Sequence, residues 1–554
     1  MLVYQAVADA FHKEGVDALF TLMGDGNMHF SAELAEKPGV QTIYVRHEHS
    51  AVAMAAAYAR ATGKPGVASV TCGPGLTQLS TALATAFNAR IPLVVFAGET
   101  PIDAAFYTQR IDQGPLVTAT GSHYIQAHSM ARMLDYVREA FWVATTESRP
   151  VVIGLPYDMQ LWEIAATQAY EPSSAFLPKL PPLEPEAETV AAAVDVIKGA
   201  SRIVIIGGRG AVQSGAQAGC LRLAELVDGL LATTLPARGL FDDDPFSLGI
   251  AGGYASGLAR EMFAKADLVI AVGASLNFHT MDGRRLFGHA HILQIDSAPT
   301  GFRDGLRTGN SFVRSDARKG VEALVAALEP SAPRPADWRS DTLARRIATE
   351  PADSEYYPPE NSVMDPRDTI TSLDAALPRD WAYVNGTGHS AGFAAHMRGR
   401  RPEDFLTIRE FGAIGNGLCF AVGMAVARPD KPIVVIDGDG SILMHIQELE
   451  TIRRHNLRIL VCVLNDGAYG PEIHKLRKDG IDESGSIFGR GDFGAIARAF
   501  GLSGRVITSV EQIPEALEAF RSHDGSELWD LHISDRVMTS MMRRGVAKRK
   551  PIKG

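Results

Sequence analysis

Residues 431–470 show the clearest pattern of apolar and polar positions in the chain. The segments 432–437 and 458–464 are short runs rich in β-branched residues, which is typical of buried strands. Between them, apolar residues recur at helical spacing from Ile442 to Ile452. The order strand, helix, strand predicts a right-handed crossover that joins two parallel strands of one sheet.

Glycine and acidic residues follow both of these predicted strands. Gly438-Asp439-Gly440 comes after the first strand and Asn465-Asp466-Gly467 after the second. Because the carboxyl ends of parallel strands meet at one edge of a sheet, the two Asp side chains are expected to converge on one hard cation. The backbone amides that open the helix could bind a diphosphate there. From the spacing alone, an ordinary βαβ unit with Asp and Gly in its turns is an equally good interpretation.

Similar patterns recur in the first part of the chain. Apolar runs alternate with stretches at helical spacing, which predicts a parallel α/β domain. The predicted strands cover residues 17–23, 41–46, 66–71 and 91–97, and the predicted helices cover residues 50–62 and 75–89. Between residues 187 and 328, the runs RIVIIGG, ADLVIAVG and HILQID predict strands of another α/β layer.

Two proline-rich stretches, 171–186 and 329–360, divide the chain into three segments of domain size. We therefore predict an α/β protein with three doubly wound parallel-sheet domains. The predicted domains are residues 1–168, 187–328 and 361–540, followed by a basic, solvated tail at residues 541–554.

Composition narrows the class of protein. A chain of 554 residues is too long for one core, and 46% hydrophobic with 21% charged residues is typical of a soluble globular protein. A net charge of −10 argues against a nucleic-acid binder, and no apolar run approaches the length of a membrane span. The four cysteines form no C-x-x-C pair, which favours reduced thiols in a cytoplasmic protein over a zinc site or disulfides.

The sequence GDGS, followed after the helix and second strand by NDG, resembles the metal and diphosphate motif of thiamine diphosphate (ThDP) enzymes. The resemblance covers essentially the whole chain. It implies a pyrimidine-binding domain, a Rossmann-like middle domain and a diphosphate-binding domain. It also implies that Asp439, Asp466 and the main-chain carbonyl of Ala468 hold Mg²⁺. The family more often has Asn at the position of Asp466, which here keeps an oxygen ligand and adds a negative charge.

The stretch RHEHSAVAMAAAYARATGKPGVASVTCGPG resembles the pyrimidine-binding domain of the acetolactate synthase branch of these enzymes. By this resemblance Glu48 lies against the aminopyrimidine ring and shares a proton with a ring nitrogen. Taken in isolation, a favourable carboxylate in the first turn of a helix is the more ordinary interpretation of Glu48.

Further cofactor contacts are implied in the third segment, where the turn 385–390 and the run GAIGNG at 412–417 resemble family motifs. There Ile414 would bend ThDP into its V shape, and the Gly412 carbonyl would hold the exocyclic amine. The structural alternatives are a capped helix start and a core isoleucine. The cofactor-binding residues that the resemblance implies are Gly388, His389, Ser390, Gly412, Ile414, Gly438, Gly440, Ser441, Tyr469 and Gly470. For Tyr469 and for His474, a core tyrosine and a surface histidine are the more ordinary interpretations.

The residues that would define the substrate match less closely. Acetolactate synthases carry a Phe-Gln pair where this chain has TQRIDQG, so the catalytic candidate Gln113 is a partial match. Two acids resemble pyruvate decarboxylases instead: Asp25, in the turn GDGN, and Glu472, six residues after a metal ligand. Paired over the reactive carbon, they could deliver a proton and release an aldehyde. A turn Asp and a solvated Glu at a helix start are the structural alternatives.

Because most of the chain resembles acetolactate synthases, we expect ThDP- and Mg²⁺-dependent decarboxylation of a 2-oxo acid with carboligation, a transferase or lyase activity. The alternatives are simple decarboxylation to an aldehyde and C–C cleavage of a related diketone. A non-catalytic nucleotide-binding protein is disfavoured by the presence of both Glu48 and the metal motif. The resemblance also implies a homodimer or homotetramer in which Glu48 of one chain meets the Asp439 domain of another.

FAD is possible in the middle domain, where GASLNFHTMDGRRL loosely matches the FAD-binding members of the family. Gly208-Arg209-Gly210 is a poor dinucleotide fingerprint, because Gln213 stands where a third glycine would be. A packing role is the favoured interpretation of these glycines. In the expected reaction a flavin would be structural, since no net electrons are transferred.

Overall fold

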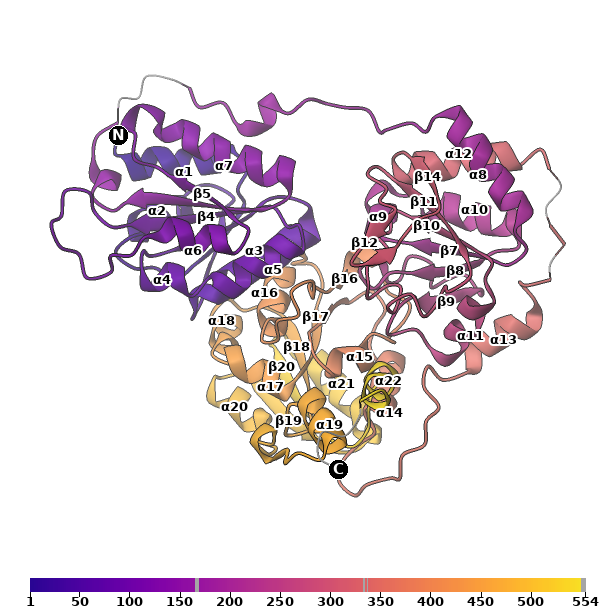
Figure 1. Cartoon of the computed structure of the whole chain (residues 1–554). Helices are drawn as coiled ribbons and strands as arrows, with labels where there is room; N and C mark the ends of the chain where they lie inside the picture. The colour runs from indigo at the N-terminus through magenta and orange to yellow at the C-terminus, as the bar shows by residue number, and fades with distance from the viewer. Residues whose placement is uncertain (165–168, 332–333, 336, 550–554) are drawn as a thin grey trace.

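The computed structural model describes residues 1–164, 169–331, 334–335 and 337–549. These residues form three α/β domains, each with a six-stranded parallel sheet flanked by helices (Figure 1). The predicted fold class is therefore confirmed. The expected end of the first domain at residue 168 and the last residues of the expected tail, 550–554, lie outside the described residues.

The first sheet has the strand order β2-β1-β3-β4-β6-β5, and its neighbouring strands are parallel. Its strands are β1 (Ala18–Thr21), β2 (Gln41–Tyr44), β3 (Gly66–Val70), β4 (Leu93–Glu99), β5 (His123–Gln126) and β6 (Pro150–Pro156). The four strands predicted from the sequence are all present, with ends that differ by one or two residues. Continuous apolar runs mark these strands because helices cover both faces of the sheet.

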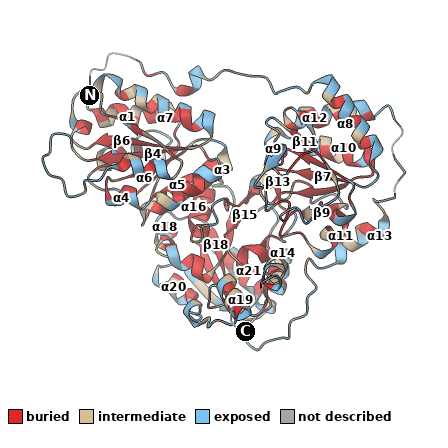
Figure 2. Ribbon diagram, viewed as in Figure 1, coloured by how far each residue is buried: buried red, intermediate tan, exposed pale blue. Residues whose placement is uncertain are grey.

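The middle sheet has the order β14-β11-β10-β7-β8-β9, and the third has the order β16-β15-β17-β18-β20-β19. The middle strands are β7 (Ile203–Gly207), β8 (Leu230–Thr233), β9 (Ser247–Ile250), β10 (Leu268–Val272), β11 (His291–Asp296) and β14 (Ser311–Arg314). The third-domain strands are β15 (Ala382–Asn385), β16 (Phe405–Leu406), β17 (Ile433–Gly438), β18 (Ile459–Asn465), β19 (Ser503–Ile507) and β20 (Glu527–His532). Figure 2 shows these sheets as the buried centres of their domains.

The first and third domains share one hydrophobic core within this chain. Helix α3 (Glu48–Thr62) packs along α16 (Gly417–Ala427), and the two lie side by side in Figure 1. Their backbones come so close that a Cβ placed on Gly423 would lie 2.2 Å from the carbonyl oxygen of Met54. Since α3 begins at Glu48, this packing sets the first turn of α3 against the third domain.

Two glycines of the middle domain serve close packing. Gly208 and Gly210 follow β7, and a Cβ on Gly208 would lie 2.2 Å from the carbonyl oxygen of Gly273 in the loop after β10. The amide of Gly210 donates a hydrogen bond of 2.9 Å to the same oxygen. The two loops therefore fill the space that a longer side chain would need.

The basic end of the chain differs from the expected solvated tail. Residues Ser540–Ala547 form helix α22, in which Arg543 forms an ion pair of 2.7 Å with Asp353. Beyond the helix, Arg549 pairs with Asp479. These carboxylates belong to distant parts of the chain, so the sequence around the tail gives no sign that its arginines have partners.

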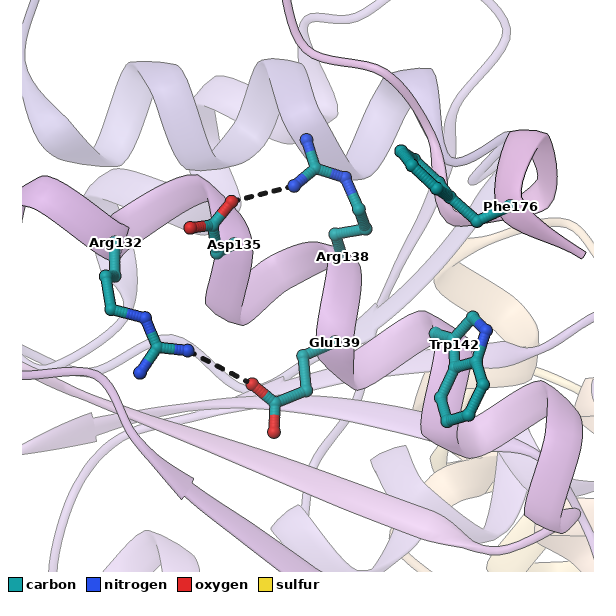
Figure 3. Close-up of a pocket in the computed structure, with 6 residues that line it drawn as sticks. All are labelled: Arg132, Asp135, Arg138, Glu139, Trp142 and Phe176. Atoms are coloured by element: carbon teal, nitrogen blue, oxygen red, sulfur yellow. Dashed lines mark hydrogen bonds and ion pairs between the residues drawn. The ribbon is translucent and has the colours of Figure 1, made fainter.

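Figure 3 shows a surface pocket on the outer side of the first domain, along α7 (Met133–Glu147). It is lined by Arg132, Asp135, Arg138, Glu139, Trp142 and Phe176. None of the residues predicted to act in a site lines this pocket. Within the described ranges, no helix combines the length and the apolar character that crossing a membrane requires.

Candidate functional site

The carboxyl edge of the third sheet brings the two predicted metal-binding acids together. Strands β17 and β18 are parallel, with Gly438 opposite Leu464, so Asp439 and Asp466 follow neighbouring strand ends. The amide of Gly467 donates to Asp439 Oδ2 at 2.7 Å, which ties the two turns to each other. The predicted crossover is thus present, with both turns at one edge of the sheet.

The helix within this crossover is broken, although the sequence predicted one helix. Helix α17 (Asp439–Ile442) is followed by a short 3-10 turn, and α18 starts only at Glu448 (Glu448–Arg454). Both helices bury apolar side chains, including Ile442 and Leu449, so the helical spacing continues across the break and hides it. The turn leaves Met444 exposed and His445 buried at the edge of the sheet.

Two carboxylates in a buried setting favour a divalent cation. Burial raises the pKa of Asp439 to about 6, and burial together with the charge of Asp439 raises the pKa of Asp466 well above its usual range. A hard cation would relieve this repulsion, and its preferred ligands are oxygens. In the described part of the chain, no group of three or more His, Cys, Asp or Glu side chains is arranged to hold a metal ion by itself. The carbonyl of Ala468, a diphosphate and water would therefore complete the ligand set, and these two acids fit Mg²⁺.

Beside these acids lie polar groups that the protein leaves unpaired. The hydroxyl oxygens of Thr387 and Ser390 and the Nε2 atom of His474 are buried without a hydrogen-bond partner. A Cβ on Gly438 would lie 3.3 Å from the Ser390 hydroxyl, which brings this serine to the metal turn. Buried polar groups are normally hydrogen-bonded, so these atoms indicate a polar ligand. They fit the oxygens of a diphosphate.

His389 faces the same place. The amide of Thr539 donates to His389 Nε2 at 3.0 Å, so the neutral ring carries its proton on Nδ1. A Cβ on Gly470 would lie 2.8 Å from this Nδ1 atom and 3.0 Å from Asp466 Oδ2. The predicted residues of the turns 385–390 and 465–470 are therefore neighbours of Asp439 and Asp466, and His389 Nδ1 lies on the side of Gly470 that also faces Asp466.

Two side chains after the metal motif differ from their ordinary interpretations. His474 was expected at the surface, but it is 5% exposed and its ring centroid lies 5.2 Å from that of His389. A core residue was the more ordinary interpretation of Tyr469, whose implied role is cofactor binding, but its side chain is 39% exposed and packs edge-on against Phe488. Helix α19 (Gly470–Asp479) begins directly after Tyr469, which leaves the tyrosine at the rim and turns His474 inward.

The glycine run 412–417 leaves room for a ligand next to Ile414. Gly412 has φ +74°, and a Cβ there would meet no atom within 4 Å. Ile414 is only partly buried, and its Cγ2 lies 3.6 Å from the Cβ position of Gly388. The amide of Gly415 donates to the hydroxyl of Ser441 at 2.8 Å, which fixes the run to helix α17. Ile414 therefore lies against the turn that contains Gly388 and is not enclosed in the core, and its role as an apolar wedge stays a prediction.

Glu48 begins α3, and the residues around it are bound to the third domain. His49 Nε2 lies 2.7 Å from Asn416 Oδ1, and the His49 ring stacks on His445 with centroids 4.6 Å apart. The amide of Arg46 donates to the fully buried carboxylate of Glu448 at 3.1 Å. The side chain of Glu48 itself is half-buried, with Oε1 3.5 Å from the Cβ position of Gly75.

Sequence reasoning missed Asn416, His445 and Glu448, which hold the first domain in place. Each lies in a segment that was interpreted for its glycine or apolar pattern. The one local sign in the sequence was that His445 and Glu448 lie near the start of a helix whose apolar side faces the core. Their partners lie hundreds of residues away, so no spacing rule could have identified the contacts.

The stacked pair of histidines predicts a dependence of stability on pH. Burial, and to a smaller extent the neighbouring His49 and His47, lowers the pKa of His445 to about 3. The folded protein keeps this ring neutral, whereas the unfolded chain takes up a proton below pH ~6.5. The neutral ring therefore contributes its full stabilisation above that pH. This stabilisation is lost as the pH falls toward 3, and the loss is on the order of 2 kcal/mol at about pH 5.

We expect His445→Gln to make the free energy of unfolding fall less steeply between about pH 7 and about pH 5 than it does in the wild type. Urea unfolding at a series of pH values measures this slope. His289→Gln, at an exposed histidine, serves as the control and should follow the wild type. Parallel curves for wild type and His445→Gln would contradict the expectation.

The three candidate catalytic residues for the substrate are not brought together. Asp25 is exposed in the turn after β1, and Glu472 forms an ion pair of 3.3 Å with Lys475. Among the residues that the structure describes, no hydrogen bond or ion pair joins Asp25 to Glu472. Gln113 is 3% exposed and accepts a hydrogen bond of 3.0 Å from the amide of Gly73. The side chain of Gln113 therefore faces protein.

Comparison with protein families identifies all three domains. Residues 1–116 match the model for the N-terminal TPP binding domain of thiamine pyrophosphate enzymes. Residues 190–324 match the model for their central domain, and residues 386–530 match the model for their C-terminal TPP binding domain. The matches follow the order of the three sheets.

Curated proteins with similar sequences cover nearly the whole chain. The chain is 32% identical to an acetolactate synthase large subunit of Parasynechococcus marenigrum, over 95% of this chain and 87% of that protein. It is 30% identical to a probable acetolactate synthase large subunit of Methanocaldococcus jannaschii, over 94% of this chain and 90% of that protein. It is also 30% identical to the large subunit of acetolactate synthase isozyme 2 of Escherichia coli, over 96% of this chain and 95% of that protein.

Proposed function

The chain belongs to the thiamine pyrophosphate enzymes, and on this premise we propose that it decarboxylates a 2-oxo acid and joins the acyl unit to a second carbonyl compound. This is an acetolactate-synthase-like activity. The observation that carries the proposal is the convergence of Asp439, Asp466 and the unpaired Ser390 hydroxyl beside the domain that presents Glu48.

The chain offers the contacts that ThDP and Mg²⁺ need. Asp439, Asp466 and the carbonyl of Ala468 would hold the metal, and Ser390 and His389 would bind the diphosphate. When bound, ThDP supplies a nucleophilic carbon that adds to the 2-oxo group and accepts the electron pair left by CO₂. The roles of the chain are to bind, to orient and to move protons.

Glu48 has the proton-handling role. Its carboxyl group lies at the start of α3, where the third domain packs against the first, and it is packed over Gly75. In the homodimer that the resemblance implies, it would share a proton with a ring nitrogen of the aminopyrimidine bound to the third domain of the partner chain. Ile414 would press the cofactor into a bent shape, because its side chain lies against Gly388 in the turn that would bind the diphosphate.

The surroundings of Glu472 favour carboligation over aldehyde release. Release of an aldehyde requires an acid that protonates the carbon from which CO₂ has left. Glu472 is half-exposed and paired with Lys475, and Asp25 lies in the first domain. Within the described part of one chain no hydrogen bond or ion pair joins these two acids, and on this basis we place attack on a second carbonyl ahead of protonation. A second chain that brought Asp25 to Glu472 would reverse this order. Simple decarboxylation and diketone cleavage are the alternative functions.

Product analysis tests this choice. We expect purified protein with ThDP, Mg²⁺ and a 2-oxo acid to yield a 2-hydroxy ketone or a 2-hydroxy-3-oxo acid together with CO₂. Free aldehyde as the main product, reduced in both Asp25→Asn and Glu472→Gln, would favour the decarboxylase instead. Cleavage of a diketone without CO₂ would support the third function.

We also propose that the active form is a homodimer or a dimer of dimers. The third domain carries exposed apolar side chains around its sheet edge, and exposed apolar patches commonly mark association surfaces. They are Phe411, Leu443, Met444, Tyr469, Ile487 and Phe488. Sedimentation of the protein with and without ThDP measures the oligomeric state.

All four cysteines are free and buried, which supports a reducing, cytoplasmic location. The proposal assigns no chemical step to FAD.

A further inference from the structure

A chain of hydrogen bonds runs behind Gln113 and connects it to the surface of the first domain. Gln113 Nε2 donates to the hydroxyl of Tyr124 at 3.2 Å. The Tyr124 hydroxyl in turn donates to Glu99 Oε1, and His128 Nε2 lies 2.5 Å from Glu99 Oε2. Glu99 is 7% exposed, so its carboxylate depends on these partners. Burial and the charge of Glu99 raise the pKa of Tyr124, so the phenol keeps the proton that it donates.

At its other end, this hydrogen-bond network holds a glycine turn through the side chain of Gln113. Gln113 Oε1 accepts from the amide of Gly73 at 3.0 Å, and Gln113 Nε2 also donates to the carbonyl of Gly98 at 3.1 Å. Gly73 has φ +56°, a conformation that other residues rarely adopt. Its turn continues to Gly75, over which the carboxylate of Glu48 is packed. The side chain of Gln113 is thus the link between the Tyr124–Glu99 pair and the wall beside Glu48.

A glycine in β6 leaves room for the pair Tyr124–Glu99. A Cβ on Gly154 would lie 2.1 Å from the Tyr124 hydroxyl and 2.9 Å from the Glu99 carboxyl carbon. No side chain other than glycine fits there while the pair is in place. The pair therefore occupies a space that the fold keeps open at this position.

We propose that Tyr124 and Glu99 are positioning residues, which orient Gln113 and through it hold the turn Gly73–Gly75 against Glu48. This inference rests on the proposed function of Glu48. Neither Tyr124 nor Glu99 needs to touch the substrate. Without their hydrogen bonds, the side chain of Gln113 is held by one fewer contact. Its hydrogen bond with the Gly73 amide then breaks more often, and the turn Gly73–Gly75 is held less firmly against Glu48.

The chain contains a matched control. Tyr170 also donates its hydroxyl to a glutamate, Glu14, in the same domain. Tyr170 packs in the core on the far side of the sheet and has no contact with the glycine turn. Tyr124→Phe and Tyr170→Phe therefore remove the same chemical group from the same kind of pair. A purely structural contribution should affect both variants alike.

The test measures hydrogen exchange at the Gly73 amide together with steady-state kinetics of the full-length protein. In Tyr124→Phe we expect faster exchange at Gly73 and a kcat lower by roughly three- to tenfold, the typical effect of one hydrogen bond. The affinity for ThDP should change less than about twofold, because the diphosphate contacts lie in the third domain. Tyr170→Phe should match the wild type at Gly73 and in kcat. Glu99→Gln provides a second, shape-conserving variant in case Tyr124→Phe folds poorly.

A double variant decides whether Tyr124 acts through Gln113. Gln113→Ala combined with Tyr124→Phe should be no slower than Gln113→Ala alone, because the link is already broken. Additive losses, or equal exchange at Gly73 in the Tyr124 and Tyr170 variants, would overturn the proposal. If the wild type shows no ThDP-dependent turnover, the proposed function fails. The exchange measurement at Gly73 still decides whether these residues hold the turn.

Discussion

Glu48→Gln should lower kcat by roughly 10²- to 10⁴-fold, the range in which a positioned acid or base contributes to catalysis. Gln keeps the size of the side chain and one oxygen but cannot donate or accept a proton in the same way. Glu48 is half-buried at the start of α3 and makes no ion pair among the described residues, so the substitution removes no structural contact of note. Turnover should therefore suffer far more than folding.

Binding and stability measurements separate these effects. Thermal unfolding of Glu48→Gln should match the wild type, and its affinity for ThDP should fall by less than about tenfold, because the diphosphate contacts remain. Glu188→Gln is the control, since Glu188 is also a first-turn glutamate, in α8 (Ala187–Gly199) of the middle domain. Near-normal turnover in Glu48→Gln would remove the main catalytic assignment.

Asp439→Asn should abolish cofactor binding at ordinary concentrations. Asp439 is 2% exposed and accepts hydrogen bonds from the amides of Gly440 and Gly467. The amide loses the charge that attracts Mg²⁺ and offers the metal one oxygen. Removing a residue that hydrogen-bonds to a metal ligand already lowers the affinity for the metal by roughly 10- to 100-fold. Removing the ligand itself should therefore lower it further. Calorimetric titration with ThDP and Mg²⁺ measures the change.

Asp466→Asn is the matched comparison, and here the expected effect is small. The family more often has Asn at this position, so an oxygen ligand remains while the repulsion between the two acids disappears. We expect turnover within about tenfold of the wild type, weaker Mg²⁺ binding because one charge is lost, and a more stable protein without metal. Equal losses in the Asp439 and Asp466 variants would contradict the different roles of the two acids.

The sequence predicted the fold well where helices cover both faces of a sheet. Apart from their last residues, Glu99 and Asn465, strands β4 and β18 are continuous apolar runs, because every residue in them is buried, and such runs can be recognised without a structure. The break between α17 and α18 escaped prediction because both helices pack against the same core and keep helical spacing. Helix α22 escaped it because its ion pairs reach Asp353 and other distant carboxylates.

The candidate site was predictable to a different degree in its two halves. Asp439 and Asp466 follow neighbouring strands, so topology alone places them together. The interface between the first and third domains depends on His49, His445 and Glu448, which meet only through tertiary packing. The position of Gln113 shows the same limit. Sequence resemblance suggested a catalytic group, while the structure shows its amide bound to Gly73 and Gly98.

The most direct test of the central claim is the release of CO₂ from a panel of 2-oxo acids by the purified protein. We expect CO₂ from at least one acid when ThDP and Mg²⁺ are both present, and none when either is left out. Glu48→Gln should lose this release while still binding ThDP. If ThDP binds tightly and no acid yields CO₂, the proposed decarboxylation is contradicted.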